Sequence, residues 1–285
     1  MWLNRYTKLL VGFTFLLIVA GGLVTSTQSG LSVPDWPLSY GKFMPPMVGG
    51  VRYEHSHRMI ASLVGLMTLI LTFWLGFREK RSWVRWLGIA ALAAVVTQGV
   101  LGGMTVLFLL PTPISIFHAC LAQTFFSLIV ALAFFTSREW LCKETFSGGN
   151  LADLKAPLRM MIALVYLQLV LGATLRHTGN PMVALSHALG SFFVLINVVL
   201  IMTRVFNRYG GEKKLIYPAL ALSVVTLFQM ALGMGSFVYI FMLPAKIQPE
   251  AERIFFVTAH QSLGALLLAA SVFFALRIYH RGNES

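Results

Sequence analysis

The sequence predicts an all-α integral membrane protein with eight transmembrane helices, arranged as two parallel-repeat four-helix bundles. The first observation behind this prediction is the composition: 57% of the 285 residues are hydrophobic and 11% are charged, whereas a soluble domain carries roughly 25% charged residues. The second is that apolar residues gather in runs long enough to cross a bilayer. The third is an internal repeat that places matching motifs in both halves. The mean hydropathy of +0.77 excludes a soluble enzyme with a polar shell and a disordered chain.

Eight apolar runs define the predicted helices. A transmembrane helix needs about 20 predominantly apolar residues, and several helices are expected to begin earlier, within polar sequence such as Tyr53–Arg58. The runs are Leu9–Thr25, Met59–Phe77, Trp86–Leu110, Ile114–Thr136, Met160–Leu175, Met182–Met202, Leu215–Leu243 and Ile254–Leu276.

The connections between these runs alternate in charge. Sixteen of the 22 Lys and Arg residues fall on one side of the predicted membrane, so the positive-inside rule predicts that both termini are cytoplasmic. The basic residues form short clusters rather than a continuous stripe, which indicates topology and excludes nucleic acid as a partner. The short segment Met1–Lys8 leads directly into the first run, so we expect a retained anchor and a prokaryotic plasma (inner) membrane.

A short pattern, Gln-x-x-Leu-Gly, recurs in three of the runs, beginning at Gln98, Gln168 and Gln229. Its residue types favour helix packing over a direct role in a site. Because each half contains four spans, both halves enter the membrane in the same direction. We therefore expect an N-terminal bundle, a cytoplasmic linker and a C-terminal bundle over residues 1–140, 141–156 and 157–285.

Four of the seven histidines lie at a similar predicted depth, each near the outer end of an even-numbered run: His57, His118, His187 and His260. An ionisable side chain is costly in a bilayer and usually faces the bundle interior with a partner. Structural zinc sites need four converging ligands, whereas each bundle offers two histidines. Two facing imidazoles suit the axial positions of a heme iron. We expect two heme sites near the outer face, one from each pair.

The two halves differ in one acidic residue. Glu54 stands three residues before His57 on nearly the same helix face, and the equivalent start of the sixth run has no carboxylate. The first site is therefore predicted to be reactive, and the second to transfer electrons or to be structural. The alternative is that Glu54 is solvated or pairs with Arg52 or Arg58.

Other polar residues on the outer side have open interpretations. Arg58 and Arg176 are candidates for contacts with heme propionates, with snorkelling to the membrane surface as an equal alternative. His55 and His177 could shuttle protons, but solvated surface histidines are favoured. The turn-rich connection from Gln28 to Gly50 is expected to cover a site, or else is a simple connector. The two cysteines, Cys120 and Cys142, predict no disulfide framework.

The segment Gly30-Leu-Ser-Val-Pro-Asp-Trp-Pro-Leu-Ser-Tyr-Gly-Lys-Phe43, followed by Glu54-His-Ser-His-Arg58 and the later histidines, resembles the heme A synthase family. The resemblance covers essentially the whole chain and implies an eight-helix oxidoreductase of two four-helix bundles. Members of this family oxidise the C8 methyl group of heme O to a formyl group by successive hydroxylations, giving heme A for terminal oxidases. Heme O synthase and terminal oxidase assembly are the implied partners, and a homo-oligomer is an open alternative to a monomer.

Carried over by position, the resemblance assigns a role to each candidate residue. It implies that His57 and His118 ligate the substrate heme, and that His187 and His260 ligate a heme b cofactor. Glu54 becomes the catalytic acidic residue, which either stabilises positive charge at the methyl carbon or accepts a proton from water.

The chain departs from the family in the first outer loop. Many members carry a cysteine pair there, at the positions of Val33 and Ser39, so a thiol role of that loop is not available. Two other functions remain open. A di-heme b-type cytochrome would pass electrons to or from quinone without chemical change in either heme, and a heme chaperone or exporter would bind heme loosely. The acidic residue beside His57 favours the enzyme over both.

Overall fold

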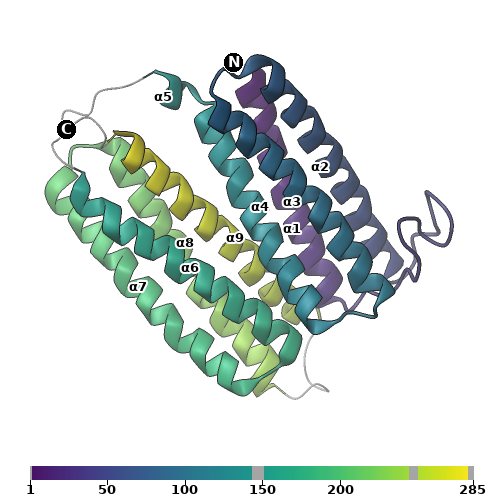
Figure 1. Ribbon diagram of the computed structural model, residues 1–285. Coiled ribbons are helices and arrows are strands. Elements are labelled where there is room, and N and C mark those ends of the chain that lie inside the picture. The colour runs from purple at the N-terminus through teal and green to yellow at the C-terminus, as the bar shows by residue number, and fades with distance from the viewer. Residues whose placement is uncertain (1, 143–150, 244–249, 282–285) are drawn as a thin grey trace.

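The computed structural model describes residues 2–142, 151–243 and 250–281. Within these ranges, eight helices are long and apolar enough to cross a membrane, and no strand is formed (Figure 1). The predicted all-α membrane class is therefore confirmed. The elements are α1 Trp2–Ser26, α2 Val51–Arg78, α3 Ser82–Leu107, α4 Thr112–Phe135, α5 Arg138–Leu141, α6 Ala152–Thr178, α7 Pro181–Tyr209, α8 Lys213–Phe237, a π-helical turn Val238–Met242, and α9 Glu250–Arg281.

Several helices extend beyond the apolar runs into polar sequence. Helix α2 begins at Val51 rather than at Met59, as expected from the polar segment before that run. Helix α6 begins at Ala152, inside the segment predicted as a linker, so the end of that predicted linker is helical. Hydropathy marks only the part of a helix that matches the hydrocarbon thickness, whereas the backbone hydrogen bonds continue into the interface.

A proline inside α6 illustrates how these extensions are held. Pro157 has no N–H, so the carbonyl of Asp153 loses its helical partner. Arg204 of α7 donates a hydrogen bond to that carbonyl. Asn197 of α7 donates to the carbonyl of Pro157 at 3.0 Å. The polar start of α6 is therefore fixed by side chains of the next helix.

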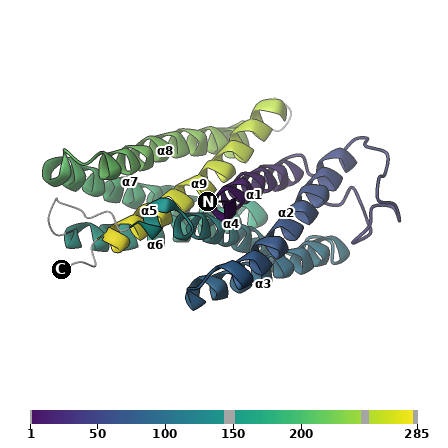
Figure 2. The same cartoon turned by 90° about the horizontal axis from the view of Figure 1, so that it is seen from above.

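The long helices form two groups, α1–α4 and α6–α9, whose members pack against one another (Figure 1). The groups meet where α9 contacts α1 and α4, and where α4 contacts α6. Seen from above, α9 runs beside α1 along this junction (Figure 2). A small buried cluster fills it: Ile18, Phe126, Ala265 and Ala269. The assignment of one heme to each group stays a prediction.

The two ends of the molecule differ in their connections. Helix α1 begins and α9 ends at the same end, and the long segment between α1 and α2 lies at the opposite end (Figure 1). At the first end, Glu139 of α5 accepts two hydrogen bonds of 2.6 Å from Arg277 of α9. Both cysteines are free, with Cys120 buried and Cys142 exposed.

Candidate functional site

The four singled-out histidines lie on four different helices, near the start of each. His57 is on α2, His118 on α4, His187 on α7 and His260 on α9, and all four are half-buried. These helix starts lie at the end of the molecule that carries the segment between α1 and α2 (Figure 1). The structure therefore places one pair in each group of helices, at a common level.

The second pair has the geometry of two ligands to one metal ion. The ring centroids of His187 and His260 lie 6.0 Å apart, with their planes at 89°. A metal–imidazole bond is about 2 Å long, so two rings on opposite sides of one iron place their centroids about 6 Å apart. The residues present fit a bis-histidine heme. The rings of His57 and His118 make no such contact within the described part of the chain.

The protonation of one ligand follows from its hydrogen bond. Nδ1 of His260 lies 3.1 Å from the backbone carbonyl oxygen of Gln229. A carbonyl can only accept, so Nδ1 is the donor and carries the proton. The neutral ring then has its lone pair on Nε2, which is the form that binds a metal.

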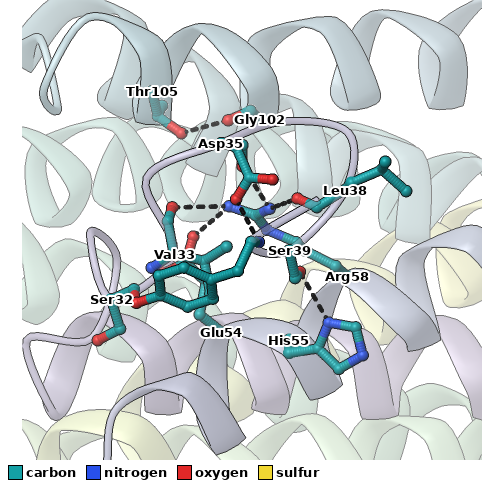
Figure 3. A network of polar contacts seen from close by, with 11 residues as sticks. Ser32, Val33, Asp35, Leu38, Ser39, Glu54, His55, Arg58, Gly102 and Thr105 are labelled. Atoms are coloured by element: carbon teal, nitrogen blue, oxygen red, sulfur yellow. Dashed lines mark hydrogen bonds and ion pairs between the residues drawn. The ribbon is translucent and has the colours of Figure 1, made fainter. Parts of the chain in front are cut away.

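Glu54 lies buried beneath the segment between α1 and α2, residues 27–50, which we name loop one. The residue is 3% exposed. Its Oε1 accepts a hydrogen bond from Nη2 of Arg58 at 2.5 Å, and its Oε2 accepts one from the backbone N–H of Val33 at 2.8 Å (Figure 3). Of the alternatives considered for Glu54, solvation is therefore wrong, and the pair with Arg58 is present.

Arg58 ties loop one to α2. Its guanidinium donates to the carbonyls of Asp35 and Leu38 at 2.7 Å each, and to that of Val33 at 3.2 Å (Figure 3). Three loop carbonyls and one carboxylate thus share a single half-buried cation. The propionate contact considered for Arg58 stays untested, and the observed contacts give this side chain the task of holding the loop.

His55 is the second polar anchor of loop one. Sequence favoured a solvated side chain, but His55 is 4% exposed. Its Nδ1 lies 2.8 Å from the hydroxyl of Ser39, which is itself buried (Figure 3). The prediction was wrong because loop one folds back over the start of α2, which a hydropathy pattern does not reveal. Backbone and hydroxyl contacts therefore hold loop one over the start of α2, where His57 lies.

Two arginines meet at the junction between the helix groups. Arg176 of α6 donates to the hydroxyl of Ser26 at 2.9 Å, and Arg253 of α9 donates to the carbonyl of Ser26 at 3.3 Å. The Ser26 hydroxyl also lies 2.8 Å from that of Thr258. Neither guanidinium forms an ion pair within the described residues, and the buried Nε of Arg176 has no hydrogen-bond partner. Together they form a cationic pair without a carboxylate.

Arg253 is the site residue that the sequence reasoning missed. It was counted only as one of the few cations on the outer side. The signal that could have found it is its place at the start of the last span, near the level of His260 and on the side that carries few charges. Its proximity to Arg176 required the packing of α9 against α1.

Comparison with known proteins supplies independent findings. The model of the COX15-CtaA family, described as cytochrome oxidase assembly protein, matches residues 4–49 and 51–187, more than half of the chain. A heme A synthase of Halalkalibacterium halodurans is 26% identical over 254 residues, covering 77% of this chain and 82% of its own. A heme A synthase of Bacillus pumilus is 23% identical over 262 residues, covering 81% and 84%. A third, of Roseobacter denitrificans, is 34% identical over 140 residues, covering 44% and 36%.

Proposed function

Because the chain belongs to the COX15-CtaA family of cytochrome oxidase assembly proteins, we propose that it is a heme A synthase. It is an oxidoreductase that converts the C8 methyl group of heme O to the formyl group of heme A by successive hydroxylations. The observation that carries this proposal is a buried carboxylate beside one histidine pair and not the other. Glu54 stands three residues before His57, and Ala184 holds the same place before His187.

The second pair, His187 and His260, is proposed to ligate the heme b cofactor. The ring separation of 6.0 Å and the Nδ1 hydrogen bond of His260 to a backbone carbonyl both support this assignment. Heme b, when bound, supplies one-electron redox chemistry. The two histidines would hold the iron, each in its neutral, metal-binding form.

The first pair, His57 and His118, is proposed to ligate the substrate heme O. Loop one excludes water from this side of α2, since its residues Val33 and Ser39 are fully or almost fully buried. Glu54 is oriented by two hydrogen bonds, so its carboxylate stays in one place when charge or a proton moves nearby. Stabilisation of positive charge at the methyl carbon and acceptance of a proton from water both fit this arrangement.

Arg176 and Arg253 are proposed to hold heme propionates. Their guanidinium groups lie around Ser26 without a carboxylate partner in the described residues, and a carboxylate is the ligand that an arginine fork binds best. Since Arg176 donates across the junction to α1, the two cations lie between the helix groups. Two propionates, one for each guanidinium, would neutralise both cations.

The membrane orientation is also a proposal. The excess of Lys and Arg in the connections at the end where α1 begins and α9 ends supports cytoplasmic termini. The histidine pairs then lie toward the outer face of a prokaryotic plasma membrane. Heme O synthase and the terminal oxidase assembly machinery are the proposed partners, and self-association stays open.

The first test compares Glu54→Gln with the unmodified protein, each purified in detergent from cells that make heme O. The extracted pigments are separated by mass. We expect the variant to keep heme while conversion falls about 100-fold or more, as when a positioned acid–base or charge-stabilising group is lost. Glu79→Gln is the matched control, because Glu79 caps the opposite end of the same helix.

Three pigment patterns are informative. Heme O or its hydroxylated products alongside b-type heme in the unmodified protein support the synthase. Full conversion by Glu54→Gln contradicts the role of Glu54. A pigment of b-type heme alone, in about two copies per chain as a bis-histidine electron carrier holds it, overturns the synthase in favour of the di-heme cytochrome.

A further inference from the structure

Each of the four proposed heme ligands faces a glycine on the preceding long helix. The pairs are Gly21 with His57, Gly102 with His118, Gly172 with His187, and Gly233 with His260. In every pair the ring atom closest to the glycine is Cε1, so the same edge of each imidazole lies against the helix backbone. A fourfold match of this kind is a property of the sites and not of one local contact.

A side chain at three of these positions would crowd the facing ring. A Cβ atom at Gly233 would lie 2.9 Å from the facing histidine ring. The corresponding distances to the facing rings are 3.0 Å at Gly21, 3.2 Å at Gly172 and 3.5 Å at Gly102. Carbon atoms pack best at about 3.5–4.0 Å. Three of the four rings therefore lie closer to the facing helix than a side chain there would allow without a shift of the ring, and the contact at Gly102 would be an ordinary one.

Each glycine also uncovers one backbone carbonyl. The carbonyl that receives Nδ1 of His260 belongs to Gln229, four residues before Gly233. Residues four apart lie one above the other on a helix face, so the absent side chain opens the way to that oxygen. The other three rings each lie near a backbone carbonyl in the same place, four residues before the facing glycine. These carbonyls belong to Leu17, Gln98 and Gln168.

The four sites differ in how far this contact is completed. Nδ1 of His57, His118 and His187 is buried and forms no hydrogen bond within the described part of the chain. Their rings thus face the carbonyl without reaching hydrogen-bond geometry, whereas His260 reaches it.

We propose that Gly21, Gly102, Gly172 and Gly233 are positioning residues for the heme ligands. Each glycine lets the ring lie edge-on to the backbone, so that Nδ1 is directed to the carbonyl four residues earlier and Nε2 stays available to the iron. The inference rests on the proposed function, because heme iron is the ligand that Nε2 binds. Loss of a partner that orients a metal-binding histidine weakens metal affinity about 10–100-fold.

This proposal revises the interpretation of Gln-x-x-Leu-Gly. The glycine of the pattern serves the histidine ring, and the glutamine contributes its backbone carbonyl. Two of the glutamine side chains, those of Gln168 and Gln229, do pack between helices, as the pattern predicted. At Gly190 and Gly264, a Cβ would meet the amides of Gln168 and Gln229 at 1.9 and 3.2 Å.

The test uses the full-length protein with its bound heme b, in detergent. Gly233→Ala and Gly172→Ala are compared with Gly99→Ala and Gly12→Ala, because a Cβ at either control position meets nothing within 4 Å. Heme retention, the midpoint potential, and the low-spin ferric EPR signal are measured. The EPR signal reports the angle between the two ligand planes, which is 89° in this structure.

We expect Gly233→Ala to weaken heme retention about 10-fold or more and to shift the EPR signal. Gly172→Ala should shift the EPR signal with a smaller loss of heme, and both controls should match the unmodified protein. Gly172→Ala decides the matter if Gly233→Ala does not accumulate in membranes. Its Cβ approaches the ring less closely, and this change needs a smaller adjustment.

Two results separate the inference from the function on which it rests. An unmodified protein that holds low-spin b-type heme, with Gly172→Ala and every accumulating Gly233→Ala sample unchanged in EPR signal and heme retention, overturns the inference alone. An unmodified protein with no low-spin heme overturns the proposed heme site, and the inference with it.

Discussion

The two histidine pairs are reached by very different segments of chain. Before His57, loop one spans residues 27–50 and folds back onto the start of α2. Before His187, the turn is two residues long: Gly179 ends α6 with φ of 63°, and Asn180 caps α7 by accepting the Met182 N–H. A left-handed glycine followed by a capping asparagine reverses the chain, so no further residues are needed between the two helices.

The side chains around the two pairs also differ, with charged residues at the first pair and alanines at the second. Glu54 and Arg58 flank His57, and Ala184 and Ala188 hold the same two places around His187. The helical frame and the glycine-backed rings are otherwise alike. Under the proposed function, the two histidine pairs would bind two similar groups, and loop one with its two charged residues would make one of the sites reactive.

The largest expected effect breaks the second site. His260→Ala removes one proposed iron ligand, so we expect heme b affinity to fall by more than about 100-fold, beyond the loss of a ligand's hydrogen-bond partner. Extracted pigment and the reduced-minus-oxidised spectrum measure this loss. His177→Ala is the control, since this histidine is not a proposed ligand. Undiminished b-type heme in His260→Ala contradicts the assignment of the pair.

A smaller effect separates the loop from the second site. Arg58→Ala leaves Glu54 buried without its cation, and breaking a buried pair costs about 3–5 kcal/mol. We expect faster proteolysis of loop one and loss of heme O conversion, while the EPR signal of the second heme is unchanged. Arg58→Lys keeps the charge but not the fork of donors, so its proteolysis rate and its heme O conversion should lie between those of the unmodified protein and Arg58→Ala. Equal protease resistance in all three proteins argues against a loop held by Arg58.

The smallest effect concerns the tip of loop one. The backbone N–H of Gly41 and, more weakly, that of Tyr40 hold the pKa of Asp35 below its ordinary value of 3.8. This stabilisation is fully present above that ordinary value and is lost as the pH falls through the lowered one. The hydrogen-exchange protection of the Gly41 amide, taken relative to the intrinsic exchange rate at each pH, should therefore fall as the pH drops below 3.8 and through the lowered pKa of Asp35. Asp35→Asn should remove this pH dependence. The same pH profile in the variant and the unmodified protein would show that the Asp35 carboxylate does not cause it.

Much of the fold could be predicted because membrane insertion acts on local sequence. The apolar runs, the alternating Lys and Arg clusters and the four histidines are each visible within a short window. The helix starts were predicted less well. Ala152 and Val51 begin helices in polar sequence, where hydrogen bonding and contacts from other helices, such as that of Arg204 with Asp153, decide the boundary.

The candidate site divides in the same way. Sequence by itself determined that two pairs of histidines lie on the even-numbered spans at one level, and that an acidic residue accompanies only the first pair. It did so because helical period and span direction fix the depth of a residue. Only the tertiary structure decided that Arg58 holds loop one, that His55 is buried under Ser39, and that Arg253 joins Arg176 at Ser26. Those contacts depend on how helices far apart in sequence rotate and pack, and no periodicity along a single chain segment encodes that rotation.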